Sequence, residues 1–173
     1  NGGSAAESHH FAAELVGRFD LDKRAALPAI SLTTDGAVVT AWANDIGYED
    51  VFARQVEALG QEGDVLFCFS TSGESTNVIN AMKKALEKNM SCIALTGKGG
   101  GEMSLYAHVN IAVPSTNTQR VQELHLHILH TLCSLLEENL FKKKIRGTTN
   151  GIEHMSGLNG NGRKLAKYEK PEV

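Results

Sequence analysis

The fold is decided by residues 65–75, which read Val65-Leu66-Phe67-Cys68-Phe69-Ser70-Thr71-Ser72-Gly73-Glu74-Ser75. Five consecutive apolar residues between two polar ones are typical of a strand that is covered on both faces. Small polar residues follow at once, and we expect a helix over residues 76–88. A strand, a polar loop and a helix begin a βαβ unit, so this stretch predicts a parallel sheet.

The residues that follow repeat the pattern. Residues 91–95 form a second apolar run, which a Gly-rich turn at 96–101 ends, and residues 109–113 predict a further strand that stops at Pro114. A long helix is then expected over residues 119–141. Its apolar side is predicted to carry Leu124, Ile128, Leu132, Leu135 and Leu136.

The residues before position 65 complete the predicted fold. An amphipathic helix is expected over residues 4–19 with Ser4 as its N-cap, followed by a connector at 20–27 and a short buried strand at 28–32. Helices over 37–43 and 49–59 flank a turn at 44–47. We therefore expect an α/β fold, a doubly wound parallel sheet flanked by helices. Because the chain opens on loop residues, we expect a segment before Asn1 to be missing.

Composition narrows the class of protein. With 173 residues, 42% apolar content and a formal charge of −3, the chain suits one globular domain. Cys68, Cys92 and Cys133 each lie in an apolar run, which favours reduced thiols and a cytoplasmic protein. No long apolar segment, signal peptide or basic excess supports membrane insertion, export or nucleic-acid binding. Residues 142–173 are basic and then rich in Gly and Asn, and are predicted to be a tail or linker.

Two loops could bind a phosphate. Residues 70–75 follow a predicted strand and precede a helix, so Ser70, Thr71, Ser72 and Ser75 can join the free N–H groups of the helix as donors. The loop of Asn1, Gly2 and Gly3 precedes a helix in the same way. A capping role alone is the alternative in both places. The turn at 97–101 is interpreted as flexible.

Histidines and carboxylates mark two helices. His10 and Glu14 are four residues apart and therefore share one helix face, where they could bind a metal, transfer protons or form a surface ion pair. Polar side chains within the apolar helix at 119–141 also indicate a site, because buried polar groups need partners. These side chains are Gln122, Glu123, His125, His127 and His130. Gln122 and His130 lie about 12 Å apart along a straight helix. The sequence therefore leaves open whether the two residues belong to one site.

Five motifs, taken in order, resemble the phosphoheptose isomerases of the sugar isomerase (SIS) domain family. The resemblance covers residues 1–141 and implies that an N-terminal helix and the first strand of the family's fold are missing before Asn1. It rests on Asn1-Gly2-Gly3-Ser4, His10-Phe11-Ala12-Ala13-Glu14-Leu15, Asn44-Asp45, Ser70-Thr71-Ser72-Gly73, and Gln122-Glu123 with His130.

The resemblance implies an aldose-ketose isomerase that converts sedoheptulose 7-phosphate to D-glycero-D-manno-heptose 7-phosphate for lipopolysaccharide heptose. It implies a homotetramer and one zinc ion per subunit. The matching metal ligands are His10, Glu14, Gln122 and His130, and Glu14 and His130 also match the acid/base pair. The matching substrate positions are Asn1, Gly2, Gly3, Asn44, Asp45, Ser70, Thr71, Ser72, Ser75 and Gln122.

The residues fit this chemistry independently of the resemblance. Isomerisation through an enediol needs a base, an acid and a group that stabilises negative charge. The carboxylate of Glu14 and the imidazole of His130 provide the first two. The main alternative is a non-catalytic SIS protein that binds a protein partner such as the replication initiator. Isomerases of arabinose 5-phosphate or hexose phosphates match the His10, Glu14, Gln122 and His130 pattern less well.

Overall fold

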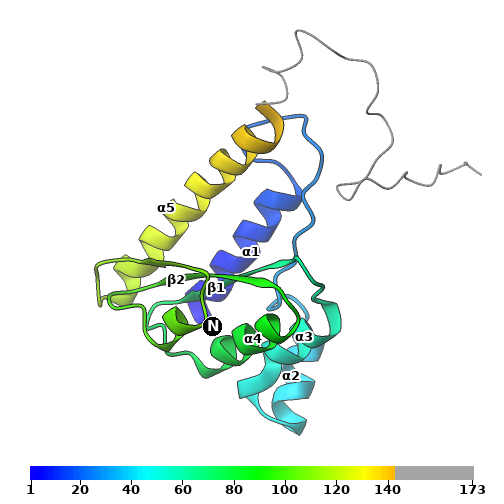
Figure 1. Cartoon of the computed structure of the whole chain (residues 1–173), viewed down its shortest axis with the longest axis vertical. Coiled ribbons are helices and arrows are strands. Elements are labelled where there is room, and N and C mark those ends of the chain that lie inside the picture. Colours follow the sequence, from blue (N-terminus) through cyan, green and yellow to red (C-terminus); the bar gives the residue numbers. More distant parts are fainter. Residues whose placement is uncertain (143–173) are drawn as a thin grey trace, which may run out of the picture. The chain divides into compact units, whose positions relative to one another are not determined.

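The computed structural model describes residues 1–142, which contain a three-stranded parallel sheet with helices on both faces (Figure 1). The strands are β1 (Val65–Ser70), β2 (Ser91–Thr96) and β3 (Val109–Ala112), in the order β1-β2-β3. The helices are α1 (Gly2–Val16), α2 (Gly36–Asp45), α3 (Val51–Leu59), α4 (Thr76–Glu87) and α5 (Thr118–Glu137). Short 3₁₀ turns are η1 (Tyr48–Asp50) and η2 (Glu102–Leu105), and a π-helical turn covers Glu138–Lys142.

The side chains of β1 and β2 point alternately to the two faces of the sheet and contribute to two separate hydrophobic cores. Cys68 of β1 and Cys92 and Ala94 of β2 pack with α3 and α4 on one face. Phe69 and Leu95, each adjacent in sequence to one of these residues, pack with α1 and α5 on the other face. Because successive strand residues point to opposite faces, a continuous apolar run is buried on both. The predicted doubly wound parallel sheet is confirmed.

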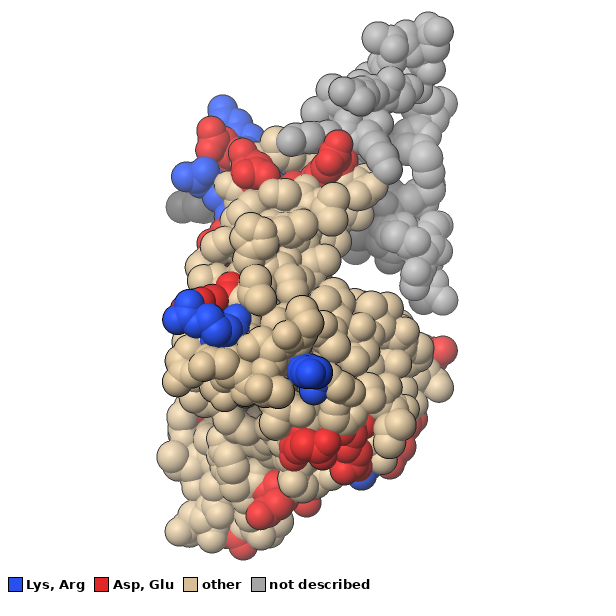
Figure 2. All heavy atoms as spheres, turned by 90° about the vertical axis from the view of Figure 1, so that its left-hand side faces the viewer, with Lys and Arg blue, Asp and Glu red and all other residues tan. Residues whose placement is uncertain are grey.

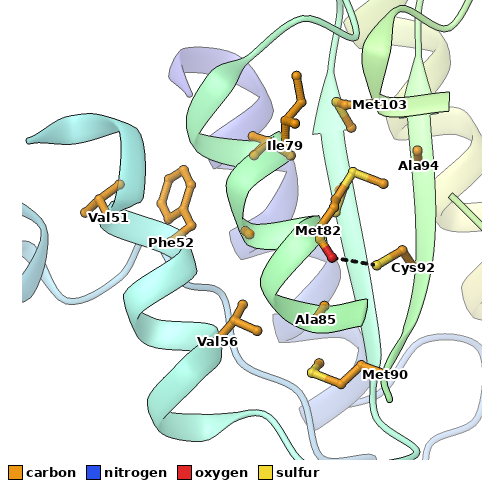
Figure 3. Packing of buried hydrophobic residues seen from close by; sticks show 13 residues of the cluster. Val51, Phe52, Val56, Ile79, Met82, Ala85, Met90, Cys92, Ala94 and Met103 are labelled. Carbon is orange, nitrogen blue, oxygen red and sulfur yellow. Dashed lines mark hydrogen bonds between the residues drawn. The ribbon is translucent and has the colours of Figure 1, made fainter. Parts of the chain in front are cut away.

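The first core is built mainly by α4 (Figure 3). Met82 is fully buried between the sheet and α3, and its carbonyl oxygen lies 3.8 Å from the Sγ atom of Cys92. Burial raises the pKa of the Cys92 thiol to about 11, and the same cause raises that of Cys133 to about 11. Both thiols are therefore protonated and inert near neutral pH, as expected of core cysteines.

The second core fixes the two helices that carry the candidate chemistry. α1 and α5 lie side by side over the same face of the sheet (Figure 1). Phe11 of α1 packs with Leu129 and Cys133 of α5, and all three side chains are at most 5% exposed. Residues of α1 and α5 that border this contact are thereby brought into one neighbourhood.

One predicted strand is wrong. Residues 28–32 form neither strand nor helix, and Ile30 is 66% exposed. Within the described part of the chain no strand pairs with this segment, and a strand exists only through hydrogen bonds to a neighbour. The other strands and helices agree with prediction, with shifts at their ends. The helix predicted over 49–59 divides into η1 and α3, and the one predicted over 119–141 ends as α5 at Glu137.

The apolar side predicted for α5 is also partly wrong. Leu124 and Leu135 are 44% and 48% exposed. The buried stripe of α5 contains a histidine and a glutamate as well as apolar residues, namely Val121, His125, Leu129, Cys133 and Glu137. The predicted tail at 142–173 lies outside the described residues apart from Lys142.

Figure 2 shows Asp and Glu gathered mainly at the upper end and over the lower part of the molecule. On this face Lys and Arg occur in small separate groups, and most of the surface comes from uncharged residues. Among the described helices, none combines the length and the apolar character that crossing a bilayer requires.

Candidate active site

Three hydroxyl groups of the loop at residues 70–75 lie close together. The Oγ atom of buried Ser70 lies 2.8 Å from that of Ser75 and 3.3 Å from that of Ser72, and it accepts a hydrogen bond from the Gly73 amide at 3.2 Å. The loop stands at the carboxyl end of β1 and leads into α4. Hydroxyl donors and the free amides of a helix N-terminus suit a phosphate, as predicted.

A second Gly-rich segment supports this loop. Gly73 has a φ of +73°, and a Cβ atom there would collide with the backbone of Gly100 and Gly101. The Gly97 amide donates to the Thr71 carbonyl oxygen at 3.1 Å. The turn at 97–101 was interpreted as flexible, but it is a packing partner of the serine loop, and its glycines permit the close approach.

The first loop meets α5. Gly2 and Gly3 form the first turn of α1, and Gly3 lies so close to Gln122 that an added Cβ would stand 2.6 Å from Nε2. A side chain at position 3 would therefore require the end of the Gln122 side chain to move. The contact brings Gly3 and Gln122, both predicted substrate positions, together from residues far apart in sequence.

Three predicted chemical residues form a cluster between α1 and α5. The Nε2 atom of His10 lies 3.1 Å from Oε1 of Glu14, and the rings of His10 and His130 meet edge to face with centroids 5.1 Å apart. His10 thus stands between the carboxylate and the second imidazole. The side chains of His10 and Glu14 are 39% and 25% exposed, so solvent and small molecules can reach them.

The cluster fits a metal in the type of its donors and in part of its geometry. Two ligands of a tetrahedral zinc ion stand about 3.4 Å apart, close to the separation of His10 Nε2 and Glu14 Oε1. Gln122, two turns before His130 on α5, instead contacts Gly3. Among residues 1–142, no group of three or more His, Cys, Asp or Glu side chains is arranged to hold a metal. Metal binding therefore requires His130 and Gln122 to turn toward the pair.

Asn44 and Asp45 remain apart from the other predicted residues. They close α2, are exposed, and bond with each other through Asn44 Nδ2 and Asp45 Oδ1 at 2.8 Å. No hydrogen bond within the described residues links either side chain to the serine loop or to the histidine cluster.

Comparison with known proteins decides the family. The family model described as SIS domain matches residues 1–97. Phosphoheptose isomerase 1 of Campylobacter jejuni is 55% identical over 139 residues, which are 80% of this chain and 74% of that protein. The chain belongs to the phosphoheptose isomerases of the SIS domain family. The protein of that name from Alteromonas mediterranea is 51% identical over 144 residues, covering 82% of this chain and 72% of its own.

Solved structures of this SIS family agree with the fold. The phosphoheptose isomerase from Francisella tularensis superposes with a TM-score of 0.76 at 40% identity, covering 80% of this chain and 73% of that one. The phosphoheptose isomerase from Neisseria gonorrhoeae superposes with a TM-score of 0.74 at 45% identity, and the coverage of both chains is the same. The SIS assignment and the isomerase class predicted from sequence are confirmed.

The structure of this SIS domain pairs His125, which the sequence analysis singled out, with Glu7, which it missed. His125 Nε2 lies 3.1 Å from the Thr96 carbonyl oxygen and must be the donor, because a carbonyl only accepts. The other ring nitrogen faces Oε2 of Glu7 at 3.8 Å, and neither atom has a hydrogen-bond partner among the described residues. The sequence signal for this pair was Glu7, a charged residue one helical turn before Phe11 on the buried face of α1.

A second missed feature anchors the helix that carries Glu14. The carboxylate of Glu137 accepts hydrogen bonds from the amides of Phe19, Asp20 and Leu21 and from Arg24 Nε. The guanidinium of Arg24 also donates to the carbonyl oxygens of Glu14 and Leu15 at the end of α1. Burial alone would raise the pKa of Glu137, but the bonds from Arg24 and the three amides outweigh it and lower that pKa below 4.5. Glu137 is a charged, fully bonded clamp between α1 and α5.

Proposed function

We propose that this protein converts sedoheptulose 7-phosphate to D-glycero-D-manno-heptose 7-phosphate. The observation that carries the proposal is the cluster of His10, Glu14 and His130 on two helices packed side by side. A carboxylate and an imidazole in one accessible place are what a ketose-to-aldose isomerisation needs. The relatives bear the name of an isomerase, so they do not support the non-catalytic, partner-binding alternative.

The reaction can be written with the residues present. Glu14 removes a proton from C1 of the ketose, the C1–C2 double bond forms, and the carbonyl oxygen on C2 takes a proton to give the enediol. Glu14 then returns a proton to C2 while the hydroxyl on C1 loses its own and becomes the aldehyde oxygen. His130 serves the two oxygens as acid and base. His10 orients the Glu14 carboxylate through their 3.1 Å contact.

The phosphate of the sugar is placed by this proposal at residues 70–75. The hydroxyl groups of Ser72 and Ser75 both lie within hydrogen-bond distance of that of Ser70, and α4 begins directly after Ser75. Donors of this kind bind an anion without a basic side chain. The open chain of the sugar would then run from the serine loop toward Glu14, past Asn1, Gly2, Gly3 and Gln122. Thr71, Asn44 and Asp45 are included in the proposal as substrate contacts.

Zinc is the metal we propose, held by His10, Glu14, Gln122 and His130. When bound, it would stabilise negative charge on the enediol oxygens. The imidazole, carboxylate and amide donors are of the type that zinc accepts. A site without a cysteine thiolate discriminates less strongly between zinc and other divalent metals.

An isomerase assay tests the reaction. The protein incubated with sedoheptulose 7-phosphate should produce the aldose phosphate, and solvent deuterium should enter at C2 because the transferred proton exchanges in the enediol. Arabinose 5-phosphate and hexose phosphates serve as controls and should react at least about tenfold more slowly. If either control sugar phosphate reacted faster than sedoheptulose 7-phosphate, the proposed substrate would be rejected.

We further propose that the functional unit is a homotetramer in the cytoplasm. Leu124 and Leu135 on α5 and Val16 on α1 are between 44% and 48% exposed, and contact with other subunits would bury these three apolar side chains. An apolar groove beside α1 is lined in part by Ala12, Val16 and Ile30. All three cysteines are free and buried, which suits a reducing compartment.

Light scattering during size-exclusion chromatography tests the assembly. We expect a mass of four chains, and we expect replacement of Leu124 and Leu135 by Ser to shift the mass toward smaller species. Changing the exposed Glu62 to Gln is the control and should leave the mass unchanged. A fully active monomer would refute the tetramer.

A further inference from the structure

Two partly buried amide contacts join the start of the chain to the helix that follows the serine loop. Asn1 Nδ2 donates to Oδ1 of Asn77 at 3.0 Å, and Asn77 Nδ2 donates back to Oδ1 of Asn1 at 2.8 Å. The hydroxyl of Tyr48 donates to the same Asn1 oxygen at 2.9 Å. Asn77 is only 4% exposed, whereas Asn1 is exposed.

The bonding capacity of Asn1 is nearly used by these contacts. A carboxamide has two acceptor sites on oxygen and two N–H donors on nitrogen. Both acceptor sites are taken, by Asn77 and Tyr48, and one N–H is taken by Asn77. One N–H of an exposed side chain, held in a fixed orientation, is left to bind a ligand.

The position of Asn77 explains what the pair fixes. Asn77 is the second residue of α4, directly after the serine loop, and it is separated from Asn1 by 76 positions in the sequence. Tyr48 lies in η1, which is itself tied to α4 through Asn80, whose amide donates to Glu49 O and Asp50 Oδ1. Asn1 is therefore held relative to the serine loop from two sides.

We propose that Asn77 is a positioning residue for the sugar-phosphate site, and that it acts through Asn1 with Tyr48 as a second support. The inference rests on the proposed function, because it assigns the free N–H of Asn1 to the sugar while the serine loop holds the phosphate. Asn77 does not touch the substrate, since it is buried and its amide is committed to Asn1. Its loss should weaken binding of the sugar portion without affecting the phosphate loop.

The test compares Asn77→Ala with Glu87→Ala. Both changes truncate a side chain of α4, but Asn77 bonds Asn1, whereas the exposed Glu87 pairs with Lys84. We expect Asn77→Ala to raise KM and Kd for sedoheptulose 7-phosphate about tenfold, as loss of an aligned hydrogen bond does, with kcat changed less than threefold. The affinity for inorganic phosphate should stay within twofold. Tyr48→Phe should shift KM in the same direction by about threefold, and Glu87→Ala should leave every value within twofold.

A readout independent of activity separates this inference from the proposed reaction. In ¹⁵N–¹H spectra the side-chain amide signals of Asn1 should move to solvent-exposed positions in Asn77→Ala and stay in place in Glu87→Ala. Asn77→Asp keeps the shape and the acceptor oxygen, and should show a weaker form of the same effects if the Ala variant does not fold. Unchanged Asn1 signals, or an equal loss of affinity for inorganic phosphate and sugar phosphate, would overturn the positioning role. An inactive wild-type protein with shifted Asn1 signals in the variant would reject the reaction but keep the contact.

Discussion

Replacing Glu14 by Gln should lower kcat for sedoheptulose 7-phosphate by at least about 10²-fold, the scale expected when a general base is lost. The change preserves shape and leaves an oxygen that can still face His10, which lies 3.1 Å from Glu14 Oε1 in the wild type. It removes only the proton acceptor. KM should therefore change much less than kcat, and steady-state kinetics separates the two.

Metal content must be measured for each variant, because Glu14 is also a proposed ligand. A Glu14→Gln protein that retains its zinc but not its turnover supports the role of base, whereas equal loss of both assigns the effect to metal binding. His130→Asn should also reduce kcat. The double variant should lose far less than the product of the single effects, because groups that act in one proton transfer are not additive. Near-normal turnover of Glu14→Gln would exclude the mechanism.

Replacing Glu137 by Ala should destabilise the fold by about 3–5 kcal/mol, the range found when one partner of a buried ion pair is removed. The side chains of Arg24 and Glu137 are 1% and 2% exposed, so Arg24 would be left charged and buried. The amides of Phe19, Asp20 and Leu21 would lose their acceptor as well. Urea unfolding monitored by circular dichroism measures the change.

The exposed pair of Arg18 and Asp22 is the matched control. Its atoms approach to 2.7 Å, but the side chains are 62% and 82% exposed, and such pairs contribute less than about 1 kcal/mol. Asp22→Ala should therefore have little effect, and an effect as large as that of Glu137→Ala would contradict the role of burial.

The Glu137 clamp also predicts how stability depends on pH. The pKa of Glu137 is lower in the folded protein than its ordinary value of 4.5. Its stabilisation should be complete above about pH 4.5 and decline as the pH falls toward the lowered value, where the folded state also takes up the proton. In the Glu137→Ala variant this part of the acid dependence should disappear.

The sequence by itself determined the βαβ unit and the serine loop. Residues 65–69 and 91–95 are apolar without interruption, and the structure places β1 and β2 there, each extended by one residue. Such runs need little tertiary information, because a strand that is apolar on both faces is stable only where helices cover both faces of the sheet. Ser70 and Ser75 could be placed in one loop because they belong to six consecutive residues between a strand and a helix. Side chains so close in sequence cannot lie far apart in the structure.

Only the tertiary structure decided which residues pair across the chain. Residues 28–32 have the composition of a strand, yet without a neighbouring strand their backbone groups have no partners of that kind, and they remain irregular. Leu124 is exposed while His125 and Glu137 are buried, because a polar side chain can be buried wherever another element supplies its partners. The partners of Glu137 are more than 110 positions away in the sequence, so no local pattern could reveal them.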